Sequence, residues 1–210
     1  MIKNNKYKIV TPTTIVIFGA TGDLIRRKLA AALLNLYCKG FMPDKFQIIG
    51  VSRRDYTDEQ FRNFLTEEAI KKADIKYSRE DLVEFLSKIT YQKGFFKDIN
   101  AYKNIKQKLI ENGNGLDICA NKLYYLAVPP KFYLEIFNNL SVSGLTLSCS
   151  DETGWTRVLV EKPFGRDIET AIKLDEILAK LFKEEQIYRI DHYLAKDTFQ
   201  NIIFFIENNN

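Results

Sequence analysis

Histidine and cysteine are scarce in this sequence. Its 210 residues include one histidine, His192, and three cysteines, Cys38, Cys119 and Cys149. An odd number of cysteines without a C-x-x-C pair does not suit a disulfide framework or a zinc site, and it fits a reducing compartment. No apolar run approaches the ~18 residues that a transmembrane helix needs, and the polar start MIKNNKYKIV lacks the apolar core of a signal peptide. The sequence therefore predicts a cytoplasmic protein that does not enter a membrane.

Excess charge of one sign is also absent. The formal net charge is only +4, from 31 basic and 27 acidic residues spread along the chain. Such a mild and mixed balance does not predict nucleic-acid binding, although a local basic pocket for a phosphorylated ligand remains compatible with it. Hydrophobic residues make up 46% of the chain, which is enough for a packed core in one large domain.

Strand and helix patterns alternate along the chain. Apolar, β-branched runs predict strands at 14–18, 46–51, 122–128, 157–161 and 187–190. Helical patterns lie at 23–38, 57–72, 79–89, 100–111, 131–140 and 167–182, with N-caps at Thr57 or Asp58 and at Asp167. This alternation predicts an α/β fold with a doubly wound, mostly parallel sheet of the Rossmann type. We expect an N-terminal arm at 1–13 and a dinucleotide-binding domain at 14–196.

The first strand runs into a turn that contains two glycines. The turn reads Gly19-Ala20-Thr21-Gly22-Asp23-Leu24 and opens the first helix. Glycines allow the backbone to approach a pyrophosphate, and the helix N-terminus adds a favourable dipole for an anion. The spacing departs from G-x-G-x-x-G, so a tight turn without a ligand is the alternative.

The end of the second strand carries arginine where an NAD enzyme carries an acidic residue. An acidic side chain at this place binds the ribose 2′-hydroxyl of NAD. This sequence has Ser52-Arg53-Arg54 instead, and guanidinium groups match a 2′-phosphate through bidentate hydrogen bonds. NADP is therefore favoured over NAD. An exposed ion pair with the nearby Asp55 is the alternative for one of the two arginines.

Two later loops also follow strands. Pro129-Pro130 follow the third predicted strand and either line a flat nicotinamide site or only stiffen a turn. Lys162 directly follows the fourth predicted strand and precedes Pro163. A cis bond there aims the lysine into the cleft, toward a phosphate or a sugar hydroxyl; a solvated lysine is the alternative.

The single histidine lies in a cluster of polar residues. Asp191-His192-Tyr193 is followed by Lys196, a combination that suits an anionic sugar. Histidine is the usual general base near neutral pH, which makes His192 a candidate base with Asp191 as its partner. Neighbours in sequence point apart on most backbones, however, so a surface or capping histidine is an equal alternative.

Taken together, these motifs resemble the glucose-6-phosphate dehydrogenase family. The matching segments are IVIFGATGDLIRRKL, IIGVSRR, LYYLAVPPKFY, VLVEKPFGRD and YRIDHYLAKD, in the family's order and spacing from about residue 14 to 206. Mild departures are Thr21 for a frequent serine, Ala195 for a glycine and Asp197 for a glutamate. The resemblance implies oxidation of glucose 6-phosphate at C1 to 6-phosphogluconolactone, with hydride transfer to NADP, in the pentose phosphate pathway.

The resemblance also assigns roles to individual residues. It implies cofactor binding by Gly19, Ala20, Thr21, Gly22, Asp23, Leu24, Arg53, Tyr133 and Lys162. It implies substrate binding by Lys162, His192, Tyr193 and Lys196, which makes His192 a phosphate ligand and not the base. Asp191 matches the catalytic aspartate that pairs with the base, and in the family that base is another histidine further downstream.

The resemblance further implies a C-terminal α+β domain that this sequence lacks. Residues 197–210 match the start of that domain, through which the family assembles as a homodimer or tetramer. Without the base, an NADP-binding module that does no chemistry is the alternative function. A short-chain reductase uses a Tyr-x-x-x-Lys pair, whereas Tyr193 and Lys196 are three residues apart, so this further alternative is disfavoured.

Overall fold

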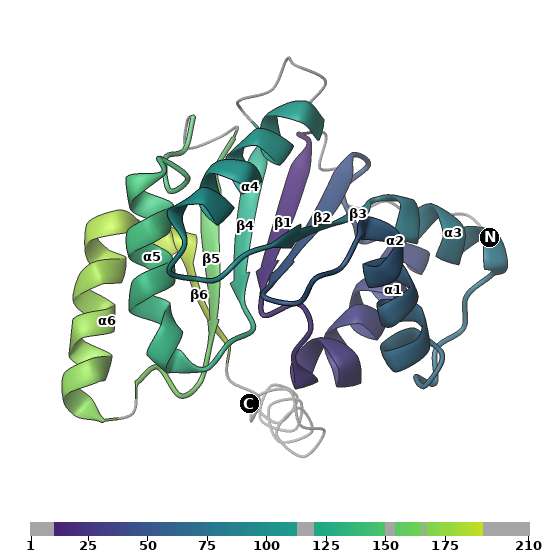
Figure 1. Ribbon diagram of the computed structural model, residues 1–210, viewed down its shortest axis with the longest axis horizontal. Helices are drawn as coiled ribbons and strands as arrows, with labels where there is room; N and C mark the ends of the chain where they lie inside the picture. Colours follow the sequence, from purple (N-terminus) through teal and green to yellow (C-terminus); the bar gives the residue numbers. More distant parts are fainter. Residues whose placement is uncertain (1–10, 113–119, 150–153, 166, 191–210) are drawn as a thin grey trace, which may run out of the picture.

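The strand β1, Thr13–Phe18, lies at the centre of the fold. All six of its residues are buried, as expected for an apolar strand covered on both faces. The computed structural model describes residues 11–112, 120–149, 154–165 and 167–190. In it, β1 pairs in parallel with β2, Phe46–Ser52, on one side and with β4, Asn121–Leu126, on the other. Figure 1 shows these strands in the middle of the molecule.

Three further strands complete a six-stranded sheet in the order β3-β2-β1-β4-β5-β6. They are β3, Ile89–Lys93, β5, Thr156–Glu161, and β6, Ile187–Ile190, and each pairs in parallel with its neighbour. This order is that of the doubly wound dinucleotide-binding fold, in which ligands bind beyond the carboxyl ends of the strands where the chain reverses direction. The predicted fold class is confirmed, and the reversal falls between β1 and β4.

Helices cover both faces of the sheet. On one face, β1 residues Val16 and Phe18 pack in one core cluster with α4, Ile99–Asn112, α5, Tyr133–Val142, and α6, Ile168–Leu181. On the other, Ile15 and Ile17 pack with α1, Ala30–Cys38, α2, Asp58–Leu65, and α3, Arg79–Ser87. Successive strand residues thus point to opposite faces, which is why one apolar run serves two cores.

Short helical turns extend several of these helices. π-helical turns at Ile25–Leu29 and Thr66–Ile70 precede α1 and follow α2, and 3₁₀ turns lie at Pro130–Phe132 and Glu184–Gln186. The predicted caps are confirmed. The Thr57 side chain accepts from the Gln60 N–H in a capping box, and Asp167 accepts from the Thr170 N–H at 2.8 Å.

One strand and several boundaries differ from the sequence analysis. The helix predicted for 79–89 ends at Ser87, and the residues that follow form β3, which was not predicted. Only Ile89 and Tyr91 of its five residues are buried, because β3 lies at the edge of the sheet, so its apolar signal is weak. Thr13, assigned to the arm, belongs to β1. The boundary at 196/197 lies outside the described residues.

Candidate functional site

The glycine loop lies against the ends of β2 and β4. Gly19 has a φ of +83°, and a Cβ atom added to it would lie 2.3 Å from the carbonyl oxygen of Ala127. Its N–H donates to the Val51 carbonyl at 2.9 Å, and the Gly22 N–H turns back to the Gly19 carbonyl at 2.9 Å. Only glycine combines this backbone conformation with so close an approach. The loop is therefore a tight turn packed between two neighbouring strand ends.

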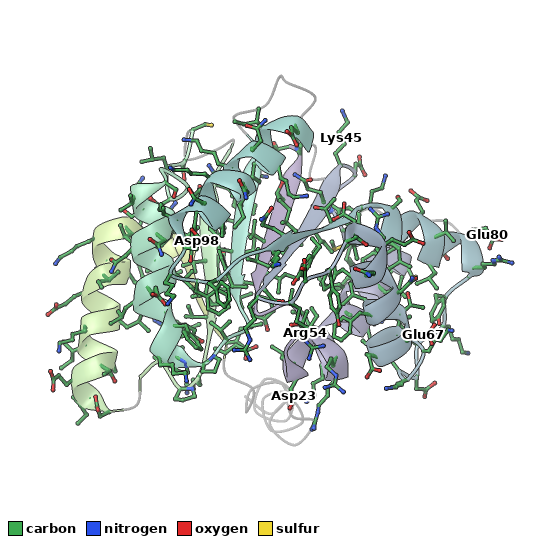
Figure 2. The ribbon with its side chains drawn as sticks, in the orientation of Figure 1. Asp23, Lys45, Arg54, Glu67, Glu80 and Asp98 are labelled. Atoms are coloured by element: carbon green, nitrogen blue, oxygen red, sulfur yellow. The ribbon has the colours of Figure 1, made fainter. Side chains whose placement is uncertain are left out.

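A cavity of about 660 Å³ opens beside this loop. It lies at the carboxyl ends of the central strands, the edge at which Figure 2 shows Asp23 and Arg54, whereas Lys45 marks the opposite edge. The volume lies in the usual range for small-molecule sites. The cavity is lined by Gly19, Thr21, Gly22, Ser52, Arg53, Arg54, Gly94, Phe95, Phe96, Lys97, Ala127, Val128, Pro129, Lys131, Phe132 and Glu135. It thus brings together the glycine loop and the arginine pair.

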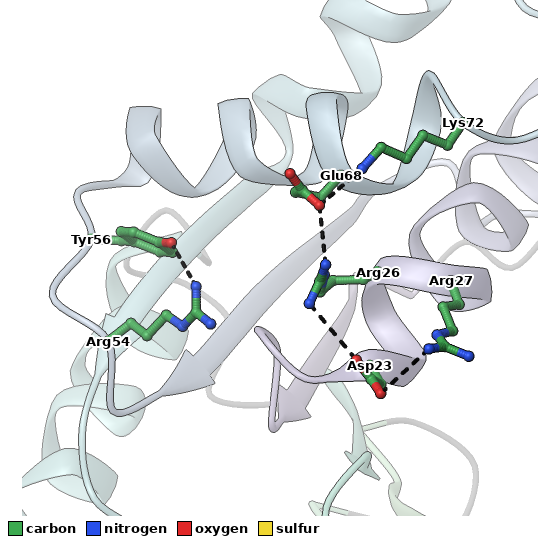
Figure 3. Close-up of polar contacts among 7 residues, drawn as sticks. All are labelled: Asp23, Arg26, Arg27, Arg54, Tyr56, Glu68 and Lys72. Atoms are coloured by element: carbon green, nitrogen blue, oxygen red, sulfur yellow. Dashed lines mark hydrogen bonds and ion pairs between the residues drawn. The ribbon is translucent and has the colours of Figure 1, made fainter.

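The two arginines after β2 differ in their surroundings. Arg54 donates to the Tyr56 hydroxyl at 3.1 Å (Figure 3). Its guanidinium also lies 5.8 Å from the centroid of the Phe64 ring. Asp55 forms an ion pair with Lys93 at 2.8 Å. Arg53 is exposed at the cavity wall. The Arg54 side chain therefore contacts α2, and Asp55 pairs with a lysine of β3. Of the two arginines, Arg53 is the one better suited to an anionic ligand.

Three residues of the glycine motif, Ala20, Asp23 and Leu24, lie away from the cavity lining. Figure 3 shows the Asp23 carboxylate between Arg26 and Arg27, at 3.8 and 3.9 Å, with the Asp23 side chain 75% exposed. Arg26 also bonds to Glu68 at 3.2 Å and so ties the first helix to the turn after α2. Leu24 packs on the core, and Ala20 is fully buried, with its N–H 3.2 Å from the Val51 carbonyl. The geometry thus gives these side chains structural contacts.

At the end of β5, two tyrosine hydroxyls meet Glu161. The Tyr125 hydroxyl donates to the Glu161 carboxylate, and the Tyr133 hydroxyl donates to the Glu161 carbonyl at 3.2 Å. The Glu161 N–H lies 3.3 Å from the same Tyr133 hydroxyl. Burial raises the pKa of both tyrosines above the usual range, so both remain protonated donors at neutral pH. Tyr133 is only 1% exposed and serves here as a backbone contact for β5.

Lys162 follows Glu161 directly in the chain. The Lys162–Pro163 peptide bond is cis, and the lysine is exposed. A second cavity of about 320 Å³ lies beside this loop, lined by Pro130, Lys131, Tyr133, Leu134, Phe164, Gly165, Thr170 and Leu174. Lys131 lines both cavities, so the second lies next to the first along the same edge of the sheet.

Comparisons with known proteins place this arrangement in a family. A family model described as "Glucose-6-phosphate dehydrogenase, NAD binding domain" matches residues 16–201. The chain belongs to the glucose-6-phosphate dehydrogenase family. It carries that family's nucleotide-binding N-terminal domain, and the recognition of its motifs in the sequence is confirmed.

Relatives in this family are similar over nearly the whole chain. Glucose-6-phosphate 1-dehydrogenase of Aggregatibacter actinomycetemcomitans is 42% identical over 189 residues, which cover 90% of this chain and 37% of that protein. Glucose-6-phosphate 1-dehydrogenase 5, cytoplasmic, of Arabidopsis thaliana is 36% identical over 205 residues, which cover 94% and 39%. Other matched relatives are named chloroplastic.

A solved structure shows the same fold. Glucose-6-phosphate dehydrogenase in complex with its substrate glucose-6-phosphate superimposes with a TM-score of 0.81 at 33% identity, covering 97% of this chain and 41% of that one. The chain thus spans about two fifths of the length of the relatives that it matches.

The structure brings together part of the site predicted from the family's motifs. Gly19, Thr21, Gly22 and Arg53 line the larger cavity, and Tyr133 lines the smaller one. The predicted catalytic and sugar-binding residues Asp191, His192, Tyr193 and Lys196 lie outside the described residues.

Several lining residues were not predicted. Ser52 and the segment 94–97 line the larger cavity. Only the place of Ser52 at the end of β2, and that of 94–97 after β3, mark them in the sequence. Once β3 is known to be a strand, the rule that ligands bind beyond strand ends points to 94–97 as well.

Within the described ranges, no helix combines the length and the apolar character that a membrane crossing needs. The same residues contain no group of three or more histidine, cysteine, aspartate or glutamate side chains placed to hold a metal ion.

Proposed function

We propose that the larger cavity binds NADP. In this proposal the pyrophosphate lies against the loop of Gly19 to Gly22, and Arg53 binds the 2′-phosphate. The observation that carries it is that a single cavity joins this loop to an exposed arginine at the end of β2, in a chain of the glucose-6-phosphate dehydrogenase family. Arginine at this place favours a 2′-phosphate over a free hydroxyl.

The residues present fit a dinucleotide. The backbone at Gly19 approaches Ala127 so closely that no Cβ fits, so the loop lies directly against the segment after β4. The hydroxyls of Thr21 and Ser52 lie 3.0 Å apart in the wall next to Arg53 and supply neutral hydrogen-bonding groups. Phe95 is an exposed aromatic ring that lines the same cavity and offers a stacking surface to a base. Bound NADP would supply the acceptor for the hydride that leaves the sugar.

We infer that the parent reaction is the oxidation of glucose 6-phosphate at C1 to 6-phosphogluconolactone. The support is the family membership, together with a similar structure that holds glucose-6-phosphate as its substrate. Lys162, at the end of β5, is the proposed contact of both cofactor and sugar. His192, Tyr193 and Lys196 are proposed to bind the 6-phosphate. Asp191 is proposed to orient the base, and Asp23, Leu24 and Ala20 to support the cofactor loop through the helix and core contacts described above.

The second candidate function is an NADP-binding module without turnover. Its support is that the sequence contains one histidine, His192, to which the family resemblance assigns phosphate binding rather than proton transfer. Loss of a general base costs roughly 10²–10⁴-fold in rate. The proposal of the parent enzyme, and not that of the module, includes assembly as a homodimer or tetramer through a further domain and action in the cytoplasm, as in the name of the Arabidopsis relative.

Two measurements on the 210-residue chain separate these functions. Calorimetric titration with NADP and with NAD tests the cofactor, and the absorbance of reduced nicotinamide on adding glucose 6-phosphate tests the chemistry. NADP binding with turnover supports the enzyme, and NADP binding without turnover supports the module. Binding of neither nucleotide, or equal binding of both, contradicts the assignment of the cavity and of Arg53.

A further inference from the structure

The hydroxyl of Tyr91 contacts the backbone next to Arg53, the residue that we propose to bind the 2′-phosphate. Tyr91 is on β3 and is 4% exposed. Its hydroxyl lies 3.1 Å from the carbonyl oxygen of Ser52 and 2.7 Å from that of Arg54. These two carbonyls flank Arg53 in the chain. A single side chain from the neighbouring strand therefore holds the backbone on both sides of the arginine.

A row of hydroxyls continues from Tyr91 to the glycine loop. The Ser52 hydroxyl lies 2.7 Å from the Tyr91 hydroxyl and 3.0 Å from that of Thr21. Ser52 Oγ also accepts a long bond from the Arg54 N–H at 3.4 Å. A hydroxyl has one proton and two lone pairs, so Tyr91 can donate to a carbonyl while accepting from Ser52. The row thereby links the arginine loop to the pyrophosphate loop.

Tyr91 is itself held firmly in place. Its N–H donates to the Asp58 carboxylate at 2.7 Å, at the first residue of α2. Its ring packs 4.8 Å from Phe61 and 5.8 Å from Tyr56, measured between centroids. Burial raises the pKa of the Tyr91 hydroxyl, which therefore keeps its proton at neutral pH. The anchor is rigid and neutral.

We propose that Tyr91 is a positioning residue for 2′-phosphate recognition. It fixes the backbone of Ser52 and Arg54, and so directs the Arg53 guanidinium to one side of the cavity before the nucleotide arrives. A planar guanidinium binds a phosphate well only in the right orientation, so holding its backbone in advance lowers the ordering cost of binding. This inference rests on the proposed function, because it presumes a nucleotide with a 2′-phosphate.

A purely structural role would act differently. If the Tyr91 hydroxyl only stabilised the loop, its loss would weaken every adenine nucleotide to the same extent. If it positions Arg53, its loss weakens only ligands that carry a 2′-phosphate. Adenosine 2′,5′-bisphosphate and 5′-AMP differ only in that group, so their affinities for the 210-residue chain separate the two roles.

The test compares Tyr91→Phe with Tyr124→Phe by calorimetric titration of both ligands. Tyr124 is a matched control, since it is also buried and its hydroxyl bonds to the carbonyl of Leu145 at 2.9 Å, outside the cavity lining. We expect Tyr91→Phe to weaken the bisphosphate by about 3- to 10-fold and to leave 5′-AMP within about twofold. Tyr124→Phe should leave both ligands unchanged. Equal losses for both ligands, or no loss, overturn the proposal.

A double variant adds a second criterion. With Arg53→Ala already present, Tyr91→Phe should cause no further loss for the bisphosphate, because the two residues then act as one unit. Independent, multiplying losses overturn the proposal. If circular dichroism shows that Tyr91→Phe does not fold, Ser52→Ala breaks the same row of hydroxyls. It should show the same selectivity with a smaller loss, and an equal loss for 5′-AMP counts against the proposal.

The wild-type titration distinguishes the two levels of inference. A wild-type chain that does not prefer the bisphosphate overturns the proposed function and this inference together. A wild-type chain that prefers it, with a Tyr91→Phe variant that keeps the full preference, overturns the role of Tyr91 alone.

Discussion

In each half of the sheet, β1 to β3 and β4 to β6, a tyrosine hydroxyl bonds to the backbone beside a cationic residue. In the first half, the Tyr91 hydroxyl bonds to the backbone on either side of Arg53. In the second half, the Tyr133 hydroxyl bonds to the backbone of Glu161, the residue before Lys162. Each cation thus follows a parallel strand, and a buried tyrosine hydroxyl bonds to the backbone where that strand ends. We call the hydrogen-bonding groups at each strand end a clasp. Such contacts fix where a flexible side chain starts, although not where it ends.

The halves differ in the charge of the clasp. Around Arg53 the hydrogen-bonding groups are hydroxyls and carbonyls, so the clasp itself carries no charge. Before Lys162, the Tyr125 hydroxyl meets a carboxylate, that of Glu161. A neutral clasp leaves the arginine's positive charge available to a phosphate dianion, whereas a neighbouring carboxylate offsets part of the lysine's field. Under the proposed function, we therefore expect selectivity for the 2′-phosphate to come from the first half.

The largest expected effect comes from adding a side chain to the glycine loop. Gly19→Ala adds a Cβ 2.3 Å from the Ala127 carbonyl at a φ of +83°. We expect it to abolish NADP binding and to lower the free energy of unfolding by on the order of 3 kcal/mol or more. Gly144→Ala is the control. Gly144 has a φ of +69° and no neighbour closer than 3.8 Å to the added atom, so its replacement should cost about 1–2 kcal/mol.

Gly144→Ala should also leave NADP binding intact. Urea denaturation and calorimetric titration measure the two effects. Similar stability losses for both variants would show that backbone strain, and not close approach, limits the loop.

The next effect sharpens the difference between the two halves. Arg53→Ala should weaken NADP by about 1.5–3 kcal/mol and leave NAD unchanged, because it removes a charged hydrogen bond to the 2′-phosphate alone. Arg54→Ala should weaken NADP less, since the Arg54 guanidinium already bonds to Tyr56. Titration of both variants with both nucleotides is the measurement. A greater loss of NADP for Arg54→Ala would exchange the roles of the two arginines.

The third effect concerns the stability of the clasps. Tyr125→Phe removes a hydrogen bond to the Glu161 carboxylate, and we expect a loss of about 1.5–3 kcal/mol in the free energy of unfolding. Tyr91→Phe removes bonds between neutral groups and should cost only about 0.5–1.5 kcal/mol. Urea denaturation of the two variants compares them directly. The charge difference between the clasps is refuted if Tyr91→Phe proves the more costly.

The smallest expected effect concerns Lys162, in the second half, which should not distinguish NADP from NAD. Lys162→Ala should weaken NADP and NAD by the same amount, about 1 kcal/mol or less, because an exposed lysine acts as a point charge in high dielectric. Lys173→Ala is a control of the same kind on α6, where the lysine pairs with Glu169, and it should change neither affinity. A selective loss of NADP for Lys162→Ala would move 2′-phosphate recognition to the second half.

Local patterns in the sequence predicted the strand, the turn and the arginine of the first half better than the contacts that join residues far apart in the chain. The strand before Gly19, the turn itself and Arg53 follow from residues that are neighbours in the chain, so they were predictable. The contact of Tyr91 with Ser52 joins residues 39 apart and depends on β3, whose short edge strand carries a weak apolar signal. The ion pairs of the Asp23 carboxylate with Arg26 and Arg27 likewise form only once the helix has brought these residues together, and the role of Asp23 at the cofactor stays a prediction.

The most direct test of the central claim is a titration of the ¹⁵N-labelled 210-residue chain with NADP, followed by amide chemical shifts. The account predicts saturable shifts centred on Gly19, Thr21, Gly22, Ser52 and Arg53, with those of Ser52 and Arg53 much smaller when NAD replaces NADP. Shifts confined to other surfaces, such as the outer side of α6, or shifts at Ser52 and Arg53 that are the same for both nucleotides, would contradict it.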